Sequence, residues 1–136
     1  VVNEFVEKAK DVDGFIFGST VHYASAGGAI TSFMDRVFYS ASCGKKSNYF
    51  LYKPAAAISS ARRAGTTSTY DQLNKYFGIT HMPIISSRYW NMVHGSTPEE
   101  VEKDEEGMQT MRILARNMAY YLKCIDAGKE KGLELP

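Results

Sequence analysis

The sequence of 136 residues is poor in the features that mark several functional classes. Its two cysteines, Cys43 and Cys124, are far apart and form neither a CxxC motif nor a zinc-binding pattern. A net charge of +1 gives no basis for binding nucleic acid or an anionic membrane surface. No apolar run approaches the roughly 20 residues of a membrane span, and no charged-then-apolar signal segment opens the chain. We therefore expect one domain over residues 1–136, cytoplasmic localisation, and neither nucleic acid nor membrane as a partner.

The sequence also lacks the short motifs of most hydrolases and metalloenzymes. It has no Gly-x-Ser-x-Gly, His-Glu-x-x-His or Gly-x-Gly-x-x-Gly pattern. The histidines His22, His81 and His94 have no carboxylate or thiol at ligand spacing, so we predict no metal site. A chain with no assignable nucleophile and base is compatible with a cofactor that supplies the chemistry, while the protein orients it and adjusts its charge.

The stretch from Asp13 to Gly28 organises the rest of the chain. Phe15–Phe17 is a continuous apolar run, which predicts a strand buried on both faces of a parallel sheet. Gly18–Ala24 is rich in small and hydroxyl residues and predicts a loop. A helix is expected to follow and to end near Tyr39, with one apolar face. That face comprises Ala26, Ala29, Ile30, Phe33, Met34, Val37 and Phe38. Loops beyond the carboxyl ends of strands are where open α/β sheets bind ligands.

A second strand and loop follow the same plan. Three alanines within Ala55–Ser60 favour a helix by propensity, but the run is short, follows a proline and ends in small residues, so we predict a strand. The loop Ala61–Ser68 contains Arg62 and Arg63, which by themselves would suit a solvent-exposed turn. Because adjacent parallel strands place their following loops side by side, we expect this loop to meet the first one.

The remaining elements are predicted from periodicity and end signals. Apolar spacing predicts helices over Val2–Ala9 and Thr69–Phe77, and a third strand over Met82–Ser87 with Ile84 and Ile85 buried. Thr97 followed by proline and glutamates is a strong helix start. The apolar stripe Met108–Ile125 predicts a long helix that ends at a glycine, residue 128.

The loop sequences resemble those of a known family. Gly18–Tyr23, followed by Phe33–Arg36, resembles the flavodoxin-like NAD(P)H-dependent FMN reductases. Thr20 and His22 stand where that family has a proline and an aromatic residue. The resemblance implies an α/β fold, a flavodoxin-like three-layer sandwich with a parallel sheet, and FMN as cofactor.

The resemblance also implies which residues hold the flavin. The first loop would lie along the ring, and an arginine of the second would stabilise negative charge on the reduced ring. The implied FMN-binding residues are Ser19, Thr20, Val21, His22, Tyr23, Ala61, Arg62, Arg63, Ala64 and Gly65.

The resemblance implies an oxidoreductase that takes hydride from NAD(P)H onto FMN and reduces a small acceptor such as a quinone or free flavin. Two alternatives stay open: a flavodoxin-like FMN electron carrier, and a non-catalytic α/β interaction domain that has lost the cofactor. The segment around Tyr89, Trp90 and His94 also looks like that of a subgroup of the family. It is either packed against the sheet or a subunit, or a wall of the flavin or substrate pocket.

The start of the chain does not match the start of the family's fold. We find neither its first two strands nor its phosphate-binding loop, so we expect residues 1–136 to be the C-terminal portion of a flavodoxin-like fold. The Phe15–Phe17 strand would then be an apolar edge, covered by a neighbouring chain or by the chain's own displaced segment. We expect a homodimer or homotetramer, with the Met108–Ile125 stripe contributing to the association.

Overall fold

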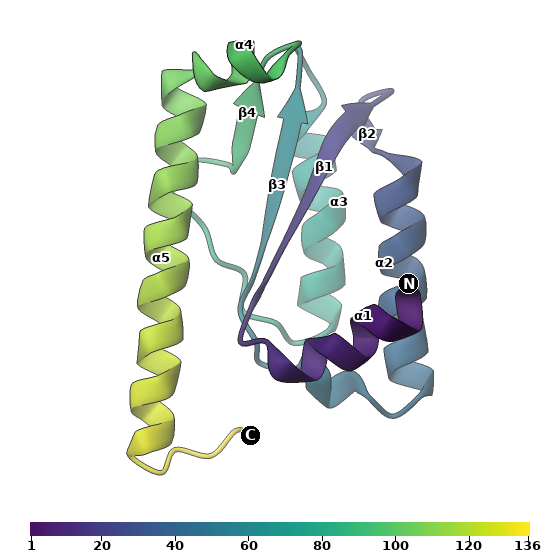
Figure 1. Cartoon of the computed structure of the whole chain (residues 1–136), viewed down its shortest axis with the longest axis vertical. Helices are drawn as coiled ribbons and strands as arrows, with labels where there is room; N and C mark the ends of the chain where they lie inside the picture. Colours follow the sequence, from purple (N-terminus) through teal and green to yellow (C-terminus); the bar gives the residue numbers. More distant parts are fainter.

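A computed structural model describes all residues 1–136 as a four-stranded sheet with helices on both sides (Figure 1). In chain order the elements are α1 (Val2–Lys8), the 3-10 helix η1 (Ala9–Asp11), β1 (Phe15–His22), β2 (Ser25–Ala26), α2 (Gly28–Cys43), the 3-10 helix η2 (Ser47–Tyr49), β3 (Ala55–Ala61), α3 (Thr66–Ile79), β4 (Met92–His94), α4 (Pro98–Glu102) and α5 (Glu105–Glu130). The strand order is β2-β1-β3-β4, with β1, β3 and β4 mutually parallel. The mostly parallel sheet with flanking helices confirms the predicted α/β class.

The strand predicted over the alanine run is confirmed. β3 pairs in parallel with β1 from Phe15 opposite Ala55 to Thr20 opposite Ser60. Ala55, Ala56 and Ala57 are completely buried. Burial between two layers outweighs the helix propensity of alanine, because the small side chains let helices approach both faces of a central strand.

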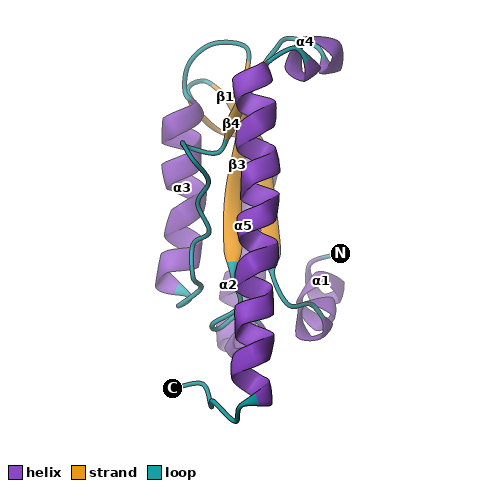
Figure 2. Ribbon diagram, turned by 90° about the vertical axis from the view of Figure 1, so that its left-hand side faces the viewer, coloured by secondary structure: helices purple, strands orange, loops and turns teal.

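The core lies in two parts, one on each side of the sheet. The larger part joins α1, α2 and α3 to the sheet and is rich in aromatic rings, with Phe17, Phe50 and Phe77 buried. On the other side, α5 packs through Leu114 and Met118. Figure 2 shows α5 running along the strands and beyond their lower ends. The centre of the predicted apolar stripe is therefore covered by the chain's own sheet, whereas Met108, Met111, Leu122 and Ile125 of the same stripe are only half-buried.

β1 is longer than the sequence predicted. The expected loop at Gly18–Ala24 is extended strand as far as His22, which pairs antiparallel with Ser25 of β2. Only Tyr23 and Ala24 turn the chain, with φ of 48° and 62°. Two positive φ angles are typical of a two-residue hairpin turn whose twist matches that of its strands. The pairing with β3 and β2 extends the strand past Gly18.

The sheet has an open edge along most of β1. Only Val21 and His22 of β1 pair with β2, so the stretch before them has a neighbour on one side only. Ile16 is 54% exposed, which corrects the prediction of a strand buried on both faces. Successive side chains of a strand point to opposite faces, and on the face of Ile16 the helix α5 packs chiefly against β3 and β4.

The predicted third strand is also corrected. Ile84 forms a single bridge to Ala55 and is exposed, whereas the regular strand β4 begins at Met92. Between them the chain leaves the sheet, because Ser87 Oγ donates to Asn91 Oδ1 at 2.7 Å and Asn117 of α5 donates to the Ser86 carbonyl at 2.7 Å. Local hydrogen bonds to side chains thus replace the strand pairing.

The helix starts have capping residues, and some lie a few residues from the predicted positions. Thr97 caps α4 as predicted, by accepting a hydrogen bond from Glu100 N. Helix α3 begins at Thr66 with Gly65 as its N-cap, three residues before the predicted start at Thr69. Asp104 caps α5 by accepting from Gly107 N at 2.9 Å. None of the helices combines the length and apolar character that crossing a membrane requires.

Candidate functional site

The two loops predicted to converge are in contact at the carboxyl edge of the sheet. Gly65 has a φ of 95°. A side chain there would place its Cβ 2.7 Å from the Cα of Ala24 and 2.7 Å from Cγ1 of Val21. Only glycine fits this position, because both the backbone angle and the available space exclude a side chain. The tip of the β1–β2 hairpin and the loop between β3 and α3 therefore form one continuous surface.

This surface presents hydrogen-bond donors that have no partner in the chain. The backbone N–H groups of residues 62 to 65 make no intrachain hydrogen bond, and neither do those of Tyr23 and Ala24. The side chains of Arg62 and Arg63 are exposed and take part in none of the chain's ion pairs. The edge is therefore rich in unpaired donors and positive charge, which suits a ligand with carbonyl oxygens or negative charge.

Three predicted residues lie in a separate hollow. Ser19, Thr20 and His22 line a space of about 390 Å³ beside the start of α2, and no residue of the second loop lines it. Ser19 Oγ accepts from Gly27 N at 3.0 Å, and Thr20 Oγ1 lies 2.9 Å from His22 Nε2. The His22 ring packs on Gly27, where a Cβ would lie 3.2 Å from His22 Cδ2.

The other predicted residues lie on or under the joint surface. Val21 is half-buried against Gly65, and the Tyr23 side chain is fully exposed at the hairpin tip. Ala61 is buried at the end of β3, whereas Ala64 is exposed. The structure thus joins one part of the first loop to the second loop and turns the other part toward α2.

His94 lies at the same edge of the sheet, although it was not among the predicted FMN-binding residues. It pairs with Ala61 at the end of β4, and Gly95 N donates to the Ala61 carbonyl at 3.1 Å. Its Nδ1 lies 3.8 Å from Oδ2 of Asp104, which also accepts from His94 N at 2.7 Å. Its position at the carboxyl end of a strand could have identified it. That signal was missed because the third strand was predicted over Met82–Ser87 and not over Met92–His94.

The aromatic pair of the preceding segment is packed on the surface. Tyr89 and Trp90 have ring centroids 4.7 Å apart and are both about half exposed. With His94 they line a hollow of only about 70 Å³. Ligand pockets usually measure about 300–1,000 Å³, so this hollow cannot enclose a flavin.

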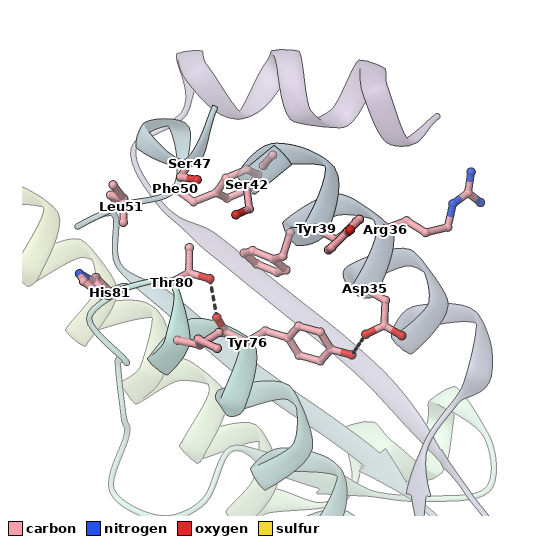
Figure 3. A pocket seen from close by; sticks show the side chains of 13 residues that line it. Asp35, Arg36, Tyr39, Ser42, Ser47, Phe50, Leu51, Tyr76, Thr80 and His81 are labelled. Carbon is pink, nitrogen blue, oxygen red and sulfur yellow. Dashed lines mark hydrogen bonds between the residues drawn. The ribbon is translucent and has the colours of Figure 1, made fainter. Parts of the chain in front are cut away.

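Other features of the chain lie away from this edge. A concavity of about 670 Å³ opens between α2 and α3 (Figure 3). No group of three or more His, Cys, Asp or Glu side chains is placed to hold a metal ion. Cys43 and Cys124 are exposed and unpaired.

Comparisons with solved structures support the fold. A Trp repressor binding protein from Bacillus subtilis matches with a TM-score of 0.68 and 15% identity, over 85% of this chain and 74% of that one. An NADPH-quinone reductase from P. pentosaceus matches with a TM-score of 0.56 and 15% identity, over 88% of this chain and 73% of that one. At these identities the similarity concerns the fold, which is flavodoxin-like as predicted.

Sequence comparisons identify the family. An iron–sulfur flavoprotein of Methanocaldococcus jannaschii is 26% identical over 132 residues, which cover 91% of this chain. The chain spans 66% of the length of that relative. The model of the NADPH-dependent FMN reductase family matches residues 1–97, which include both contacting loops. The predicted resemblance is thereby confirmed, and the chain belongs to the NADPH-dependent FMN reductase family.

Proposed function

We propose that this chain binds FMN as part of an oxidoreductase that takes hydride from NAD(P)H and reduces a small acceptor, such as a quinone or free flavin. The observation that carries the proposal is the contact between the hairpin tip and the β3–α3 loop through Gly65. This contact creates a surface rich in hydrogen-bond donors at the edge where α/β sheets bind ligands, in a chain of the NADPH-dependent FMN reductase family. The flavoprotein relative supports a flavin as the ligand.

The residues at this edge fit the cofactor. The unpaired N–H groups of residues 62 to 65 suit the carbonyl oxygens of a flavin ring. Arg62 and Arg63 would hold the cofactor and stabilise negative charge on its reduced form. When bound, the flavin supplies the capacity to accept hydride and pass on electrons, while the chain orients it. Val21 and Tyr23 would line the ring, and the hollow of Ser19, Thr20 and His22 would lie beside it.

The iron–sulfur centre in the relative's name is not part of the proposal. Such clusters take four cysteine thiolates, and this chain contains Cys43 and Cys124. Both are exposed free thiols, and on that basis we propose a reducing, cytoplasmic setting.

A flavin titration tests the proposal directly. FMN fluorescence should be quenched on binding to the chain, and Arg62→Ala and Arg63→Ala should each weaken binding several-fold. Arg112→Ala on α5 is the matched control and should leave binding unchanged. NAD(P)H consumption with a quinone should then depend on FMN. Binding without NAD(P)H consumption would instead indicate an electron carrier, and no quenching would indicate an interaction domain.

The reduction potential reports which arginine faces the ring. Loss of a nearby cation should make the potential of bound FMN more negative by about 20–30 mV, equivalent to about 1 kcal/mol for two electrons. We expect this shift in Arg62→Ala or Arg63→Ala, measured by a redox titration with an indicator dye. An unchanged potential in both variants would mean that these arginines are only surface charges.

A further inference from the structure

A histidine and a carboxylate face each other where β4 ends and α5 begins. Nδ1 of His94 lies 3.8 Å from Oδ2 of Asp104. The carboxylate is fixed in place, because it accepts hydrogen bonds from two backbone groups, His94 N at 2.7 Å and Gly107 N at 2.9 Å. Nε2, on the other side of the imidazole ring, has no hydrogen-bond partner in the chain, and the side chain is 41% exposed. One ring nitrogen therefore faces a fixed negative charge, and the other is free to contact a ligand.

This pair lies at the edge of the sheet that carries the donor-rich surface. His94 pairs with Ala61 in the register of β3 and β4, and the next residue, Arg62, begins the loop whose N–H groups are unpaired. Neighbouring strands are about 4.8 Å apart, so the His94 backbone lies one strand spacing from the start of that loop. Figure 1 shows the carboxyl ends of β3 and β4 at the same end of the sheet, beside the start of α5. A small molecule bound over the donor-rich surface can therefore also contact the ring of His94.

The surroundings of the imidazole indicate the chemistry of that molecule. Tyr89 and Trp90, both about half exposed, line the hollow of about 70 Å³ beside His94. The charged residues of its lining, besides the histidine, are Asp104 and Glu106. A water molecule occupies about 30 Å³ in the liquid, so the hollow has room for one polar group, such as a carbonyl, and not for a whole ring. Exposed aromatic faces beside a nitrogen that carries a proton suit a flat ring with an oxygen at its rim, which is the structure of a quinone.

We propose that the acceptor is a quinone and that His94 gives a proton to its oxygen, with Asp104 as the residue that positions the ring. This role rests on the function proposed above. Reduction of a quinone to a hydroquinone takes one hydride, which carries two electrons, and one proton. NAD(P)H supplies the hydride by way of the cofactor and becomes NAD(P)⁺. The Nε2–H bond of His94 breaks as the O–H bond of the hydroquinone forms, and water then returns a proton to Nε2.

Asp104 determines which ring nitrogen keeps its hydrogen. After Nε2 has given up its proton, the neutral ring holds its remaining hydrogen on Nδ1, the nitrogen that faces the carboxylate. Nε2 is then the nitrogen that accepts the next proton. The backbone hydrogen bonds of Asp104 keep this orientation constant from one turnover to the next.

Two acceptors that differ in their need for a proton test the role of His94. Ferricyanide takes one electron and no proton, whereas a quinone takes both electrons and protons. We expect His94→Gln to lower kcat with a quinone by about 100-fold or more, with little change in KM, and to leave the rate with ferricyanide unaffected.

His81→Asn is the matched control, because it removes a histidine at the opposite end of the sheet. The His81 carbonyl accepts from Tyr52 N, ahead of the first residue of β3. Asparagine tolerates the φ of 56° at this position. This variant should match the parent with both acceptors. Far-UV circular dichroism and quenching of FMN fluorescence should be the same in the parent, His94→Gln and His81→Asn, which shows that neither the fold nor the cofactor has been lost.

NMR of the imidazole nitrogens tests the pair in the chain without FMN. In alkaline solution we expect the hydrogen of the neutral His94 ring on Nδ1 in the parent, and loss of this preference in Asp104→Asn. The same variant should slow quinone reduction by about 10-fold. Glu106→Gln is the matched control, because it removes the other carboxylate of the hollow, which forms no ion pair with His94. It should leave the hydrogen on Nδ1.

Each role can be overturned separately. Unchanged quinone reduction in His94→Gln would overturn the role of His94, and so would an equal loss of rate with both acceptors. A hydrogen that stays on Nδ1 in Asp104→Asn would overturn the positioning role of Asp104. A parent chain that binds FMN but reduces neither acceptor would refute the oxidoreductase function itself, and the role of His94 with it.

Discussion

Gly65 is the residue on which the contact between the two loops depends. Its φ of 95° and the 2.7 Å approach of Ala24 Cα leave no place for a Cβ. We predict that Gly65→Ala lowers the free energy of unfolding by about 2–3 kcal/mol, through backbone strain and separation of the loops. Urea denaturation followed by circular dichroism measures this loss. FMN binding should fall with it, since the donor surface would be disrupted.

Gly78→Ala is the control for that experiment. Gly78 lies in α3, and a Cβ there would meet no atom within 4 Å. Alanine should therefore raise the free energy of unfolding by about 0.5–1 kcal/mol, because it favours the helix. If both variants lost stability equally, the special role of Gly65 would be refuted.

Tyr76 links α3 to α2 and should respond to alkaline pH. Burial, together with the hydrogen bond to Asp35 and that carboxylate's charge, raises the pKa of Tyr76 to about 12. Above pH 10 the unfolded tyrosine ionises while the folded one stays protonated, so Tyr76 stabilises the fold less as pH rises from about 10 to 12. Tyr76→Phe should cost about 1 kcal/mol at neutral pH and show a shallower alkaline loss in urea titrations. An identical alkaline loss in both proteins would contradict this.

At the scale of elements, Asp104 joins the start of α5 to the end of β4. It caps the helix by accepting a hydrogen bond from Gly107 N, and it also accepts one from His94 N. One carboxylate therefore pairs backbone N–H groups of both elements. Asp104→Ala should lower the free energy of unfolding by about 2–3 kcal/mol, because it removes the cap and leaves the His94 N–H unpaired.

Chemical denaturation of two further variants separates these contributions. Asp104→Asn keeps an acceptor and should cost about 1 kcal/mol. Thr97→Ala removes only the cap of the short helix α4 and should cost about 1 kcal/mol or less. Equal losses in Asp104→Ala and Thr97→Ala would show that the link to β4 contributes nothing.

At the scale of the whole molecule, the sheet is paired unevenly. β3 has partners on both sides at Ala55 and at Ser59–Ala61, whereas β1 has only β3 from Phe15 to Thr20. Amide hydrogen exchange should therefore be slow at both ends of β3, while alternate amides of β1 exchange roughly 100-fold faster. Uniformly slow exchange along β1 would mean that its open edge is paired with another strand.

Much of the fold follows from patterns that are local in the sequence. Apolar spacing and helix caps indicate the order of strands and helices, and Thr97 marks a helix start that the structure confirms. Strand Ala55–Ala61 could be predicted although its alanines favour a helix, because the length of the run and its flanking residues are also local signals. The loops of the candidate site could be identified because each follows a strand.

The division of the site could not be predicted in this way. Interpreted as a loop, residues 18–24 have no defined faces. In the strand, Val21 meets Gly65, whereas Thr20 and His22 point to the opposite face and line another hollow. Ser19 does not follow this alternation, because its hydroxyl accepts from Gly27 N at that hollow. The extension of that strand depends on pairing with β3, which is far away in the sequence and whose backbone groups replace water as hydrogen-bond partners. Likewise, nothing near His94 in sequence indicates Asp104, ten residues away.

The sequence by itself determined the α/β class, the family and the two loops that meet, because these depend on side-chain periodicity and on residues such as glycine and arginine within short segments. Only the tertiary structure decided where strands begin and end, which side chains share a hollow, and which apolar residues stay exposed. Ile16 and Ile79 are exposed, whereas Ile85 is buried, although all three are equally apolar. Exposure depends on which layer covers a residue, and that is set by contacts between segments far apart in the chain.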